Sequence, residues 1–124
     1  MKLSRKNISV SASAIFLLAI VVLAIPVLIK NALTLDAPTI SFNKSSNVLS
    51  WNSVSHADYY IVKICGTDRG TVEVEIANTS YSCGAYINKN KSRDYQFYVK
   101  AVSNNSYYSE SKWSRGIYYS LFAI

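Results

Sequence analysis

Apolar and polar positions divide the chain into two unlike parts. Residues 8–29 (ISVSASAIFLLAIVVLAIPVLI) contain no charged side chain. As a helix this run would be about 33 Å long, enough to cross a hydrocarbon core of about 30 Å. From about residue 37 onward the pattern changes to short alternating runs broken by turn residues, and no helical period is sustained. The sequence therefore predicts one transmembrane helix followed by an all-β domain.

Seven short runs in the second part have the character of β-strands. Residues 71–76 alternate most clearly, with Glu73 and Glu75 on one face and valine or isoleucine on the other. The number and spacing of the runs predict a seven-stranded antiparallel sandwich. The predicted strands are 39–42, 48–51, 59–64, 71–76, 81–87, 94–103 and 113–122.

Several of these runs carry motifs of a known family. The motifs are Pro38 ahead of the first strand, 48–51 (VLSW), 57–62 (ADYYIV), 79–81 (TSY) and 95–103 (YQFYVKAVS). Together they resemble a fibronectin type III domain, most closely the copies in surface and secreted proteins of low-GC Gram-positive bacteria. The resemblance covers nearly all of residues 38–121.

This resemblance implies an immunoglobulin-like sandwich in which the third and sixth strands are neighbours and the last strand joins them. The alternation of apolar residues agrees with the resemblance on the interior of the domain. The side chains expected to face inward are Ile40, Phe42, Leu49, Trp51, Tyr60, Val62, Ile64, Tyr81, Tyr95, Phe97, Val99, Ala101, Ile117 and Tyr119.

The apolar run at residues 8–29 has two interpretations. A cleaved signal peptide has an apolar core of about 7–15 residues and a small-x-small cleavage site, for which Ala24 and Ala37 offer positions. The longer run favours an uncleaved anchor. Three basic residues precede it and only Lys30 follows closely, which predicts a cytoplasmic N-terminus and a domain outside.

Four segments follow from these patterns. We expect a cytoplasmic basic tail at 1–7, a transmembrane anchor or uncleaved signal at 8–29, a linker at 30–37 and a fibronectin type III-like domain at 38–124. The short linker would keep the domain within about 25 Å of the membrane.

The net charge of +6 is unevenly distributed along the chain. Lys2, Arg5 and Lys6 flank the apolar run, whereas residues 31–124 hold nine Lys or Arg and seven Asp or Glu, a net charge of +2. A basic protein invites a nucleic-acid interpretation. Because much of the excess belongs to the flank of a membrane segment, we expect no nucleic-acid partner.

The two cysteines, Cys65 and Cys83, are separated by seventeen residues. With one histidine in the chain and no Cys-x-x-Cys motif, they cannot complete a zinc site. In an oxidising compartment an even pair favours a disulfide, which would contribute about 3 kcal/mol. Two reduced, unrelated thiols are the alternative. A cysteine pair also departs from the fibronectin type III pattern, which usually has none.

Residues suited to catalysis are sparse. His56 is the only histidine and lies in a predicted turn, and Glu73 and Glu75 share one face of a short strand, where a solvated pair is expected rather than an acid–base pair. The four glycines form no phosphate-binding loop. We therefore expect no enzyme, no cofactor and no metal site.

Tyrosine is in excess, with ten residues, all after residue 58. About four are needed for the core, and the alternation turns others outward beside lysine on the third, sixth and last strands. Exposed Tyr beside Lys is typical of binding surfaces, although cross-strand Tyr pairs also stabilise a solvated sheet. The predicted surface comprises Tyr59, Ile61, Lys63, Tyr98, Lys100 and Tyr118, and the loop 103–114 adds Tyr107 and Tyr108.

A small basic cluster is formed by Lys89, Lys91 and Arg93, with Asn88 and Asn90 between and beside them. A solvated loop between strands explains this composition. The alternative is attraction to an anionic surface such as lipid head groups or wall polymer.

These features predict a membrane-anchored extracytoplasmic module that binds or spaces and does not catalyse. Its expected partner is another surface or membrane protein, or a cell-envelope glycan. One alternative is an accessory subunit of a membrane complex held through its helix, with the small residues of 9–14 at the contact. The other is a secreted soluble module that binds carbohydrate or protein after signal cleavage.

Overall fold

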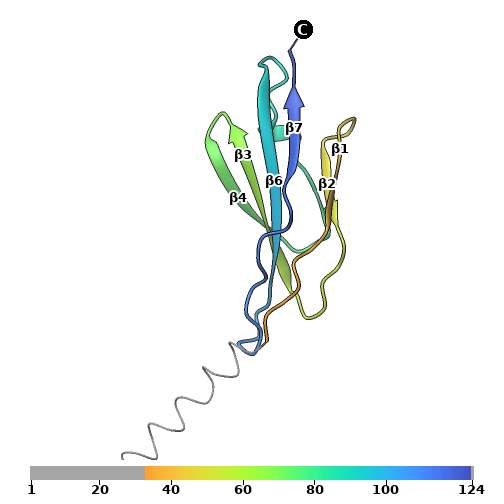
Figure 1. Ribbon diagram of the computed structural model, residues 1–124, viewed down its shortest axis with the longest axis vertical. Helices are drawn as coiled ribbons and strands as arrows, with labels where there is room; N and C mark the ends of the chain where they lie inside the picture. The colour runs from red at the N-terminus through yellow and green to blue at the C-terminus, as the bar shows by residue number, and fades with distance from the viewer. Residues whose placement is uncertain (1–32, 124) are drawn as a thin grey trace, which may run out of the picture.

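The computed structural model describes residues 33–123, which form two antiparallel β-sheets packed face to face (Figure 1). One sheet has the order β1-β2-β5 and the other β4-β3-β6-β7. The strands are β1 (Ile40–Asn43), β2 (Val48–Trp51), β3 (Tyr59–Thr67), β4 (Gly70–Ile76), β5 (Ser80–Ser82), β6 (Arg93–Val102) and β7 (Ile117–Leu121), and a 3₁₀ turn, η1, spans Gly84–Tyr86.

The strand order confirms the predicted sandwich. The third and sixth strands, β3 and β6, pair along their length, with Val62 opposite Val99, and β7 joins β6. This is the neighbour relation that the resemblance to fibronectin type III domains implied. The described residues therefore form an all-β, fibronectin type III-like sandwich.

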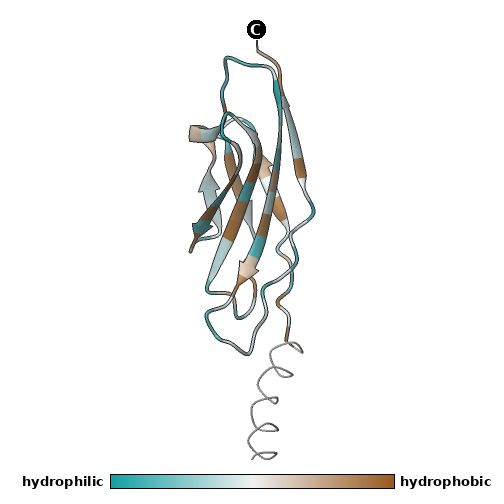
Figure 2. Ribbon diagram, turned by 90° about the vertical axis from the view of Figure 1, so that its left-hand side faces the viewer, coloured by the Kyte–Doolittle hydropathy of each residue, from teal (hydrophilic) through white to brown (hydrophobic). Residues whose placement is uncertain are grey.

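Alternation of apolar and polar residues explains why β3 and β6 lie at the centre of their sheet. Every second side chain is buried from Tyr60 to Ile64 on β3 and from Tyr95 to Ala101 on β6, and the hydropathy bands along the strands in Figure 2 follow this period. Of the fourteen side chains predicted to face inward, ten are buried. The other four, Ile40, Phe42, Tyr81 and Ile117, are partly buried and pack against the rest.

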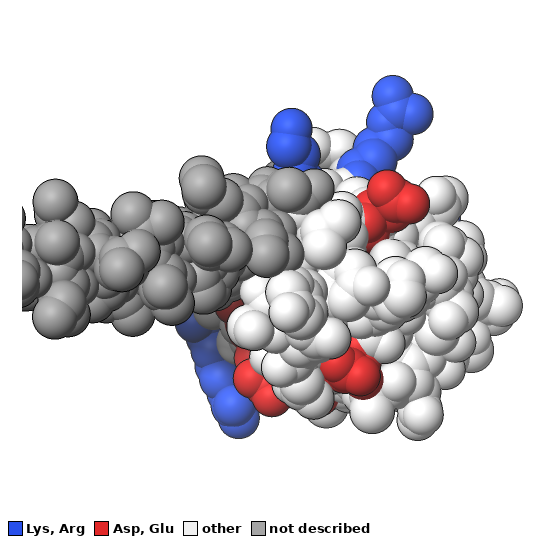
Figure 3. All heavy atoms as spheres, turned by 90° about the horizontal axis from the view of Figure 1, so that it is seen from below, with Lys and Arg blue, Asp and Glu red and all other residues white. Residues whose placement is uncertain are grey.

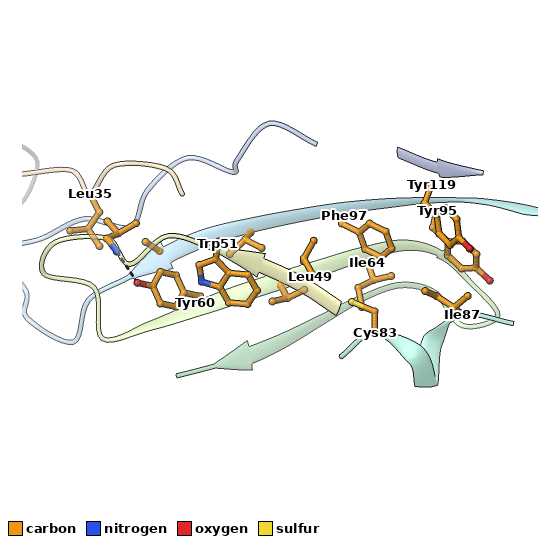
Figure 4. Packing of buried hydrophobic residues seen from close by; sticks show 14 residues of the cluster. Leu35, Leu49, Trp51, Tyr60, Ile64, Cys83, Ile87, Tyr95, Phe97 and Tyr119 are labelled. Atoms are coloured by element: carbon orange, nitrogen blue, oxygen red, sulfur yellow. Dashed lines mark hydrogen bonds between the residues drawn. The ribbon is translucent and has the colours of Figure 1, made fainter. Parts of the chain in front are cut away.

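Aromatic rings fill much of the space between the sheets (Figure 4). The ring of Phe42 stacks on that of Phe97 with centroids 4.5 Å apart, and Trp51 meets Tyr60 edge-on at 5.6 Å. The buried Tyr60 hydroxyl accepts a hydrogen bond of 2.9 Å from the Val54 amide, the dashed line in Figure 4. Rings thus fill a large part of the core. The Tyr60 and Tyr95 hydroxyls remain hydrogen-bonded, whereas the buried Nε1 of Trp51 has no hydrogen-bond partner among the described residues.

Two strand predictions differ from the structure. The run 81–87 is a strand only to Ser82 and then turns into η1, whose following residue Ile87 is buried. The run 113–122 becomes a strand only at Ile117. In both places the apolar spacing continues through a segment whose backbone makes turn or side-chain hydrogen bonds instead of a ladder.

The first described residues belong to the folded domain rather than to a free linker. The Leu35 amide donates to the Ser109 carbonyl at 3.0 Å, and the Ser109 amide donates to the Leu33 carbonyl at 2.8 Å. Leu35 is buried at the end of the core, next to Trp51 and Tyr60 in Figure 4. The expected linker at 30–37 therefore overlaps residues that are already fixed to the sandwich.

The predicted tail at 1–7 and the predicted anchor at 8–29 lie outside the described residues. Between residues 33 and 123, no helix is long and apolar enough to cross a membrane.

The predicted disulfide between Cys65 and Cys83 is wrong, since both thiols are free. Cys65 follows the inward-facing Ile64 on β3, and the alternation turns it to the outer side of the four-stranded sheet. Cys83 follows β5 and lies fully buried between the sheets, in the cluster that contains Ile64 and Ile87 (Figure 4). The two side chains are therefore expected to lie on opposite sides of the four-stranded sheet.

The two thiols are expected to react differently. Burial raises the pKa of the Cys83 thiol to about 12, so its reactive thiolate is scarce in the folded protein. At mildly alkaline pH and without reductant, a maleimide should modify Cys65 and leave Cys83 intact until the protein is unfolded. Mass spectrometry of the full chain, with Cys65→Ser as the control, measures this. Absence of labelling in unfolded, unreduced protein would instead indicate a disulfide.

Candidate functional site

The sheet β4-β3-β6-β7 turns one face to the core and one away from it, and we call the second the outer face. In register, Ile61 on β3 lies opposite Lys100 on β6, and Lys63 lies opposite Tyr98. Tyr118 on β7 lies opposite Gln96, two residues before Tyr98. Five of the predicted surface residues, Ile61, Lys63, Tyr98, Lys100 and Tyr118, therefore share the outer face as neighbours.

A stack of cations and rings orders the middle of the outer face. The Lys63 ammonium lies 4.3 Å from the centroid of the Trp113 ring and 4.8 Å from that of Tyr98. The Lys100 ammonium lies 4.6 Å from the Trp113 centroid and 3.1 Å from a Glu110 carboxylate oxygen. Trp113 is thus approached by two cations, an arrangement worth about 0.5–1 kcal/mol per contact at an exposed site.

The sequence did not predict the position of Trp113, which depends on two buried serines. The Ser111 amide donates to the Ala101 carbonyl at 2.9 Å, and the Ala101 amide donates back to Ser111 Oγ at 2.8 Å. Ser114 does the same with Val99, at 2.8 and 3.0 Å. Each serine pairs with β6 as a residue of a neighbouring strand would, except that its hydroxyl accepts the hydrogen bond that a backbone carbonyl normally accepts. The Ser-x-x-Ser spacing of Ser111 and Ser114, which lie on either side of Trp113, was the one feature of the sequence that could have indicated this position.

Removing one of these hydroxyls is expected to destabilise the domain. Ser114→Ala leaves the Val99 amide without its acceptor in a buried position, which costs about 1–3 kcal/mol. Ser120→Ala, at an exposed position of β7, should change the unfolding free energy by less than about 0.5 kcal/mol. Chemical unfolding of both variants measures the difference. Equal effects would mean that the Ser114 hydroxyl does not support the backbone.

Tyr98 and Tyr118 form a pair beside this stack. The Tyr98 hydroxyl donates to Gln96 Oε1 at 3.1 Å, and its ring covers Gly116, where an added Cβ would displace the ring. The pKa of Tyr98 is raised, first by its side-chain hydrogen bond with Tyr118 and then by desolvation. Tyr118 itself is 69% exposed. On β7, the outer face therefore presents the solvent-exposed ring of Tyr118, which lies beside the hydrogen-bonded Tyr98.

The predicted tyrosines of the loop 103–114 lie elsewhere. Tyr108 stacks on His56 with ring centroids 4.4 Å apart, and Tyr107 is 53% exposed. Both lie at the end of the sandwich where the described chain begins, because Ser109 is hydrogen-bonded to Leu33 and Leu35. In the view onto this end, few charges are visible and most of the described surface is uncharged (Figure 3). Tyr59, at the start of β3 and opposite Val102, lies nearer this end than Tyr98 does.

The basic cluster lies at the other end of the sandwich. Arg93 and Lys91 reach Asp68 with N–O distances of 2.7 and 3.8 Å, and the Asn88 side-chain amide donates to the same carboxylate at 3.0 Å. The Asn88 hydrogen bond, followed by Arg93, lowers the pKa of Asp68. Asp68 therefore offsets part of the positive charge of this cluster, in accord with a solvated loop.

The remaining polar candidates occupy ordinary positions. His56 has a positive φ of 67°, as suits the predicted turn, and Glu73 and Glu75 are exposed on β4. Within residues 33–123, no group of three His, Cys, Asp or Glu side chains lies close enough to hold a metal ion.

Comparisons with known proteins gave matches only among solved structures. No family model matches the chain, and no curated protein matches it either. Among solved structures, a Fn3-like protein from Clostridium thermocellum matches 68% of this chain and 86% of its own, with 24% identity and a TM-score of 0.45. A structure of titin kinase and its flanking domains matches 68% of this chain and 17% of its own, with 22% identity and a TM-score of 0.46.

Proposed function

We propose that the chain is a non-catalytic, membrane-anchored module that binds another protein outside the cytoplasm through the outer face. The observation that carries the proposal is the exposure of Tyr118 beside the ordered group of Tyr98, Lys63 and Trp113. A rigid aromatic side chain supplies a large contact area and loses little conformational entropy on binding.

The opposite sheet provides the contrast that selects this face. On the sheet β1-β2-β5, most positions that point away from the core hold serine. They are Ser41, Ser50, Ser80 and Ser82, and the other two are Asn43 and Val48. The hydroxyls of Ser41 and Ser50 lie 3.1 Å apart and hydrogen-bond to each other. Protein interfaces are enriched in Tyr and Trp and depleted in Ser, so the composition favours the four-stranded sheet as the binding side.

The anchor sets the geometry in which the outer face would act. Under this proposal only residues 30–32 separate the predicted helix from Leu33, which is hydrogen-bonded into the sandwich. The end with Tyr107 and Tyr108 would then lie nearest the membrane, and the basic cluster at Lys89 and Lys91 would lie farthest from it. Such proximity favours a partner that is itself at the membrane, and it disfavours contact of the basic cluster with the lipid of the same membrane.

Photocross-linking in the native membrane tests the proposal. A photoreactive residue at Ser120, an exposed β7 position close to Tyr118, should give a discrete protein adduct. Adding Tyr118→Ala should remove the adduct, whereas Tyr107→Ala, which changes another exposed tyrosine at the membrane-proximal end, should leave it. An adduct that survives Tyr118→Ala would contradict the proposal. An adduct with envelope glycan alone would assign the face to the other expected partner class.

A further inference from the structure

β4 forms one margin of the four-stranded sheet and pairs only with β3 (Figure 1). It is seven residues long, whereas the other marginal strands, β1, β5 and β7, have four, three and five residues. In addition, β1 lies near β7 on the opposite side of the sandwich. A marginal strand presents a row of backbone N–H and C=O groups that can pair with a further strand. β4 is the longest such row among residues 33–123.

The side chains of β4 leave this row accessible. Proteins protect marginal strands by keeping them short, with proline, with charged side chains, with inward-pointing charges, with bulges or with a covering segment. β4 contains no proline, and its inward positions Val72, Val74 and Ile76 are all apolar. The one irregularity in its pairing with β3 lies beside the turn that joins the two strands, between Ile64 and Thr67 on β3. Proline, inward-pointing charges and bulges are therefore absent from residues 72–76. The outward charges of Glu73 and Glu75 discourage pairing with an acidic or uncharged strand, but they do not discourage pairing with a basic one.

The inward side of β4 is incompletely covered. Because β1 lies against β7, the orders β1-β2-β5 and β7-β6-β3-β4 run in the same direction, so the shorter sheet ends at β5 on the side of β4. β5 spans three residues and β4 seven. Accordingly, Val72, Val74 and Ile76 are only half-buried. A strand added beside β4 would place alternate side chains over this apolar row.

The outward side of β4 carries two glutamates, which favour a positively charged partner strand. Glu73 and Glu75 are exposed, and neither is ion-paired with another residue in the described part of the chain. Lys63 is opposite Glu73 in register, but its ammonium lies over Trp113 and Tyr98. Two carboxylates two residues apart on one face of a strand match basic residues at alternate positions of a partner strand.

A second copy of the chain fits this margin poorly. Antiparallel pairing of two β4 strands about Val74 would set Glu73 of each copy opposite Glu75 of the other. Like charges directly opposite each other destabilise a strand pair. The charge pattern therefore favours a different protein over self-association.

We propose that the free margin of β4 binds an extended segment of a partner protein by strand addition. The segment carries Lys or Arg at alternate positions facing Glu73 and Glu75, with apolar residues between them facing Val72, Val74 and Ile76. Backbone hydrogen bonds supply the affinity and the alternate side chains supply the selectivity. This site is separate from the outer-face contact of Tyr118, and either can exist without the other.

A blocked peptide of alternating lysine and valine, as long as β4, tests the inference on the full chain in zwitterionic detergent, with empty micelles as the blank. Saturable binding is expected by calorimetry. Two control peptides carry N-methyl groups on all lysine amides or on all valine amides. Successive amides of a strand point to opposite sides, so one control should lose binding and the other should keep it. Equal behaviour of the two controls would overturn strand addition.

Charge reversal at β4 gives the matched protein control. Glu75→Lys should weaken binding of the lysine–valine peptide about tenfold and should strengthen binding of a glutamate–valine peptide. Asp36→Lys makes the same change of charge at an exposed position outside β4 and should change neither affinity by more than about twofold. Identical effects of the two substitutions would overturn the site. Peptide-free dimerisation that Glu75→Lys abolishes would assign β4 to a second copy and would also overturn the proposal.

Discussion

Gly66→Ala is expected to destabilise the domain by about 3 kcal/mol. Gly66 has a φ of +89°, where an L side chain costs about 1–2 kcal/mol. An added Cβ would also overlap the carbonyl oxygen of Asp94 on β6, which is backbone and cannot rotate away. The Gly66 carbonyl meanwhile accepts a hydrogen bond of 3.1 Å from Arg93, so a displaced backbone would lose this contact as well. Chemical unfolding followed by tryptophan fluorescence measures the loss.

Gly70→Ala provides the matched comparison. Gly70 has a similar φ of +83°, but an added Cβ there would meet no atom within 4 Å. The substitution should therefore cost only the left-handed conformation, about 1–2 kcal/mol. Equal losses at the two glycines would mean that the close approach of β3 to β6 at Asp94 does not constrain Gly66.

Phe97→Ala is expected to have the largest effect on stability, about 3–5 kcal/mol. Phe97 is fully buried on the central strand β6, and its ring stacks on Phe42 of the opposite sheet. Truncation removes this contact between the sheets and leaves a cavity that the surrounding strands cannot close. Because small domains are stable by only about 5–15 kcal/mol, much of the folded population would be lost at elevated temperature.

The control for Phe97→Ala is the same substitution at Phe122, a phenylalanine that is exposed rather than buried. Its side chain is 78% exposed, so Phe122→Ala should change the unfolding free energy by less than about 0.5 kcal/mol. A comparable loss for both substitutions would show that the ring of Phe97 is not what joins the two sheets.

Period-two patterning was a sound guide wherever a strand buries one face. It placed Val62 and Val99 inward and Lys63 and Tyr98 outward, as the structure has them. The same alternation, continued past Lys63 and Ile64 on β3, turns Cys65 outward. It therefore argues against a disulfide between Cys65 and the buried Cys83. The disulfide prediction failed because it considered compartment and cysteine number and did not follow the alternation through Cys65.

Other parts of the site depend on contacts that leave no periodic signal. Trp113 reaches the outer face because the Ala101 and Val99 amides donate hydrogen bonds to the hydroxyls of Ser111 and Ser114. The Ser-x-x-Ser spacing marks the two serines, but it does not show which backbone amides they meet. Leu35 was assigned to a linker because it stands apart from any strand pattern, yet its amide pairs with Ser109 and its side chain fills the end of the core. The face could thus be predicted from alternation, and the residues that fix it could not.

The proposed function depends above all on retention of residues 8–29. The most direct measurement is the intact mass of the protein recovered separately from native membranes and from the medium. A full-length mass confined to the membrane fraction is the expected result, and it would place the outer face next to membrane-bound partners. A shortened mass in the medium, beginning after Ala24 or Ala37, would contradict the anchor. Cleavage after Ala37 would also remove Leu35 from the core.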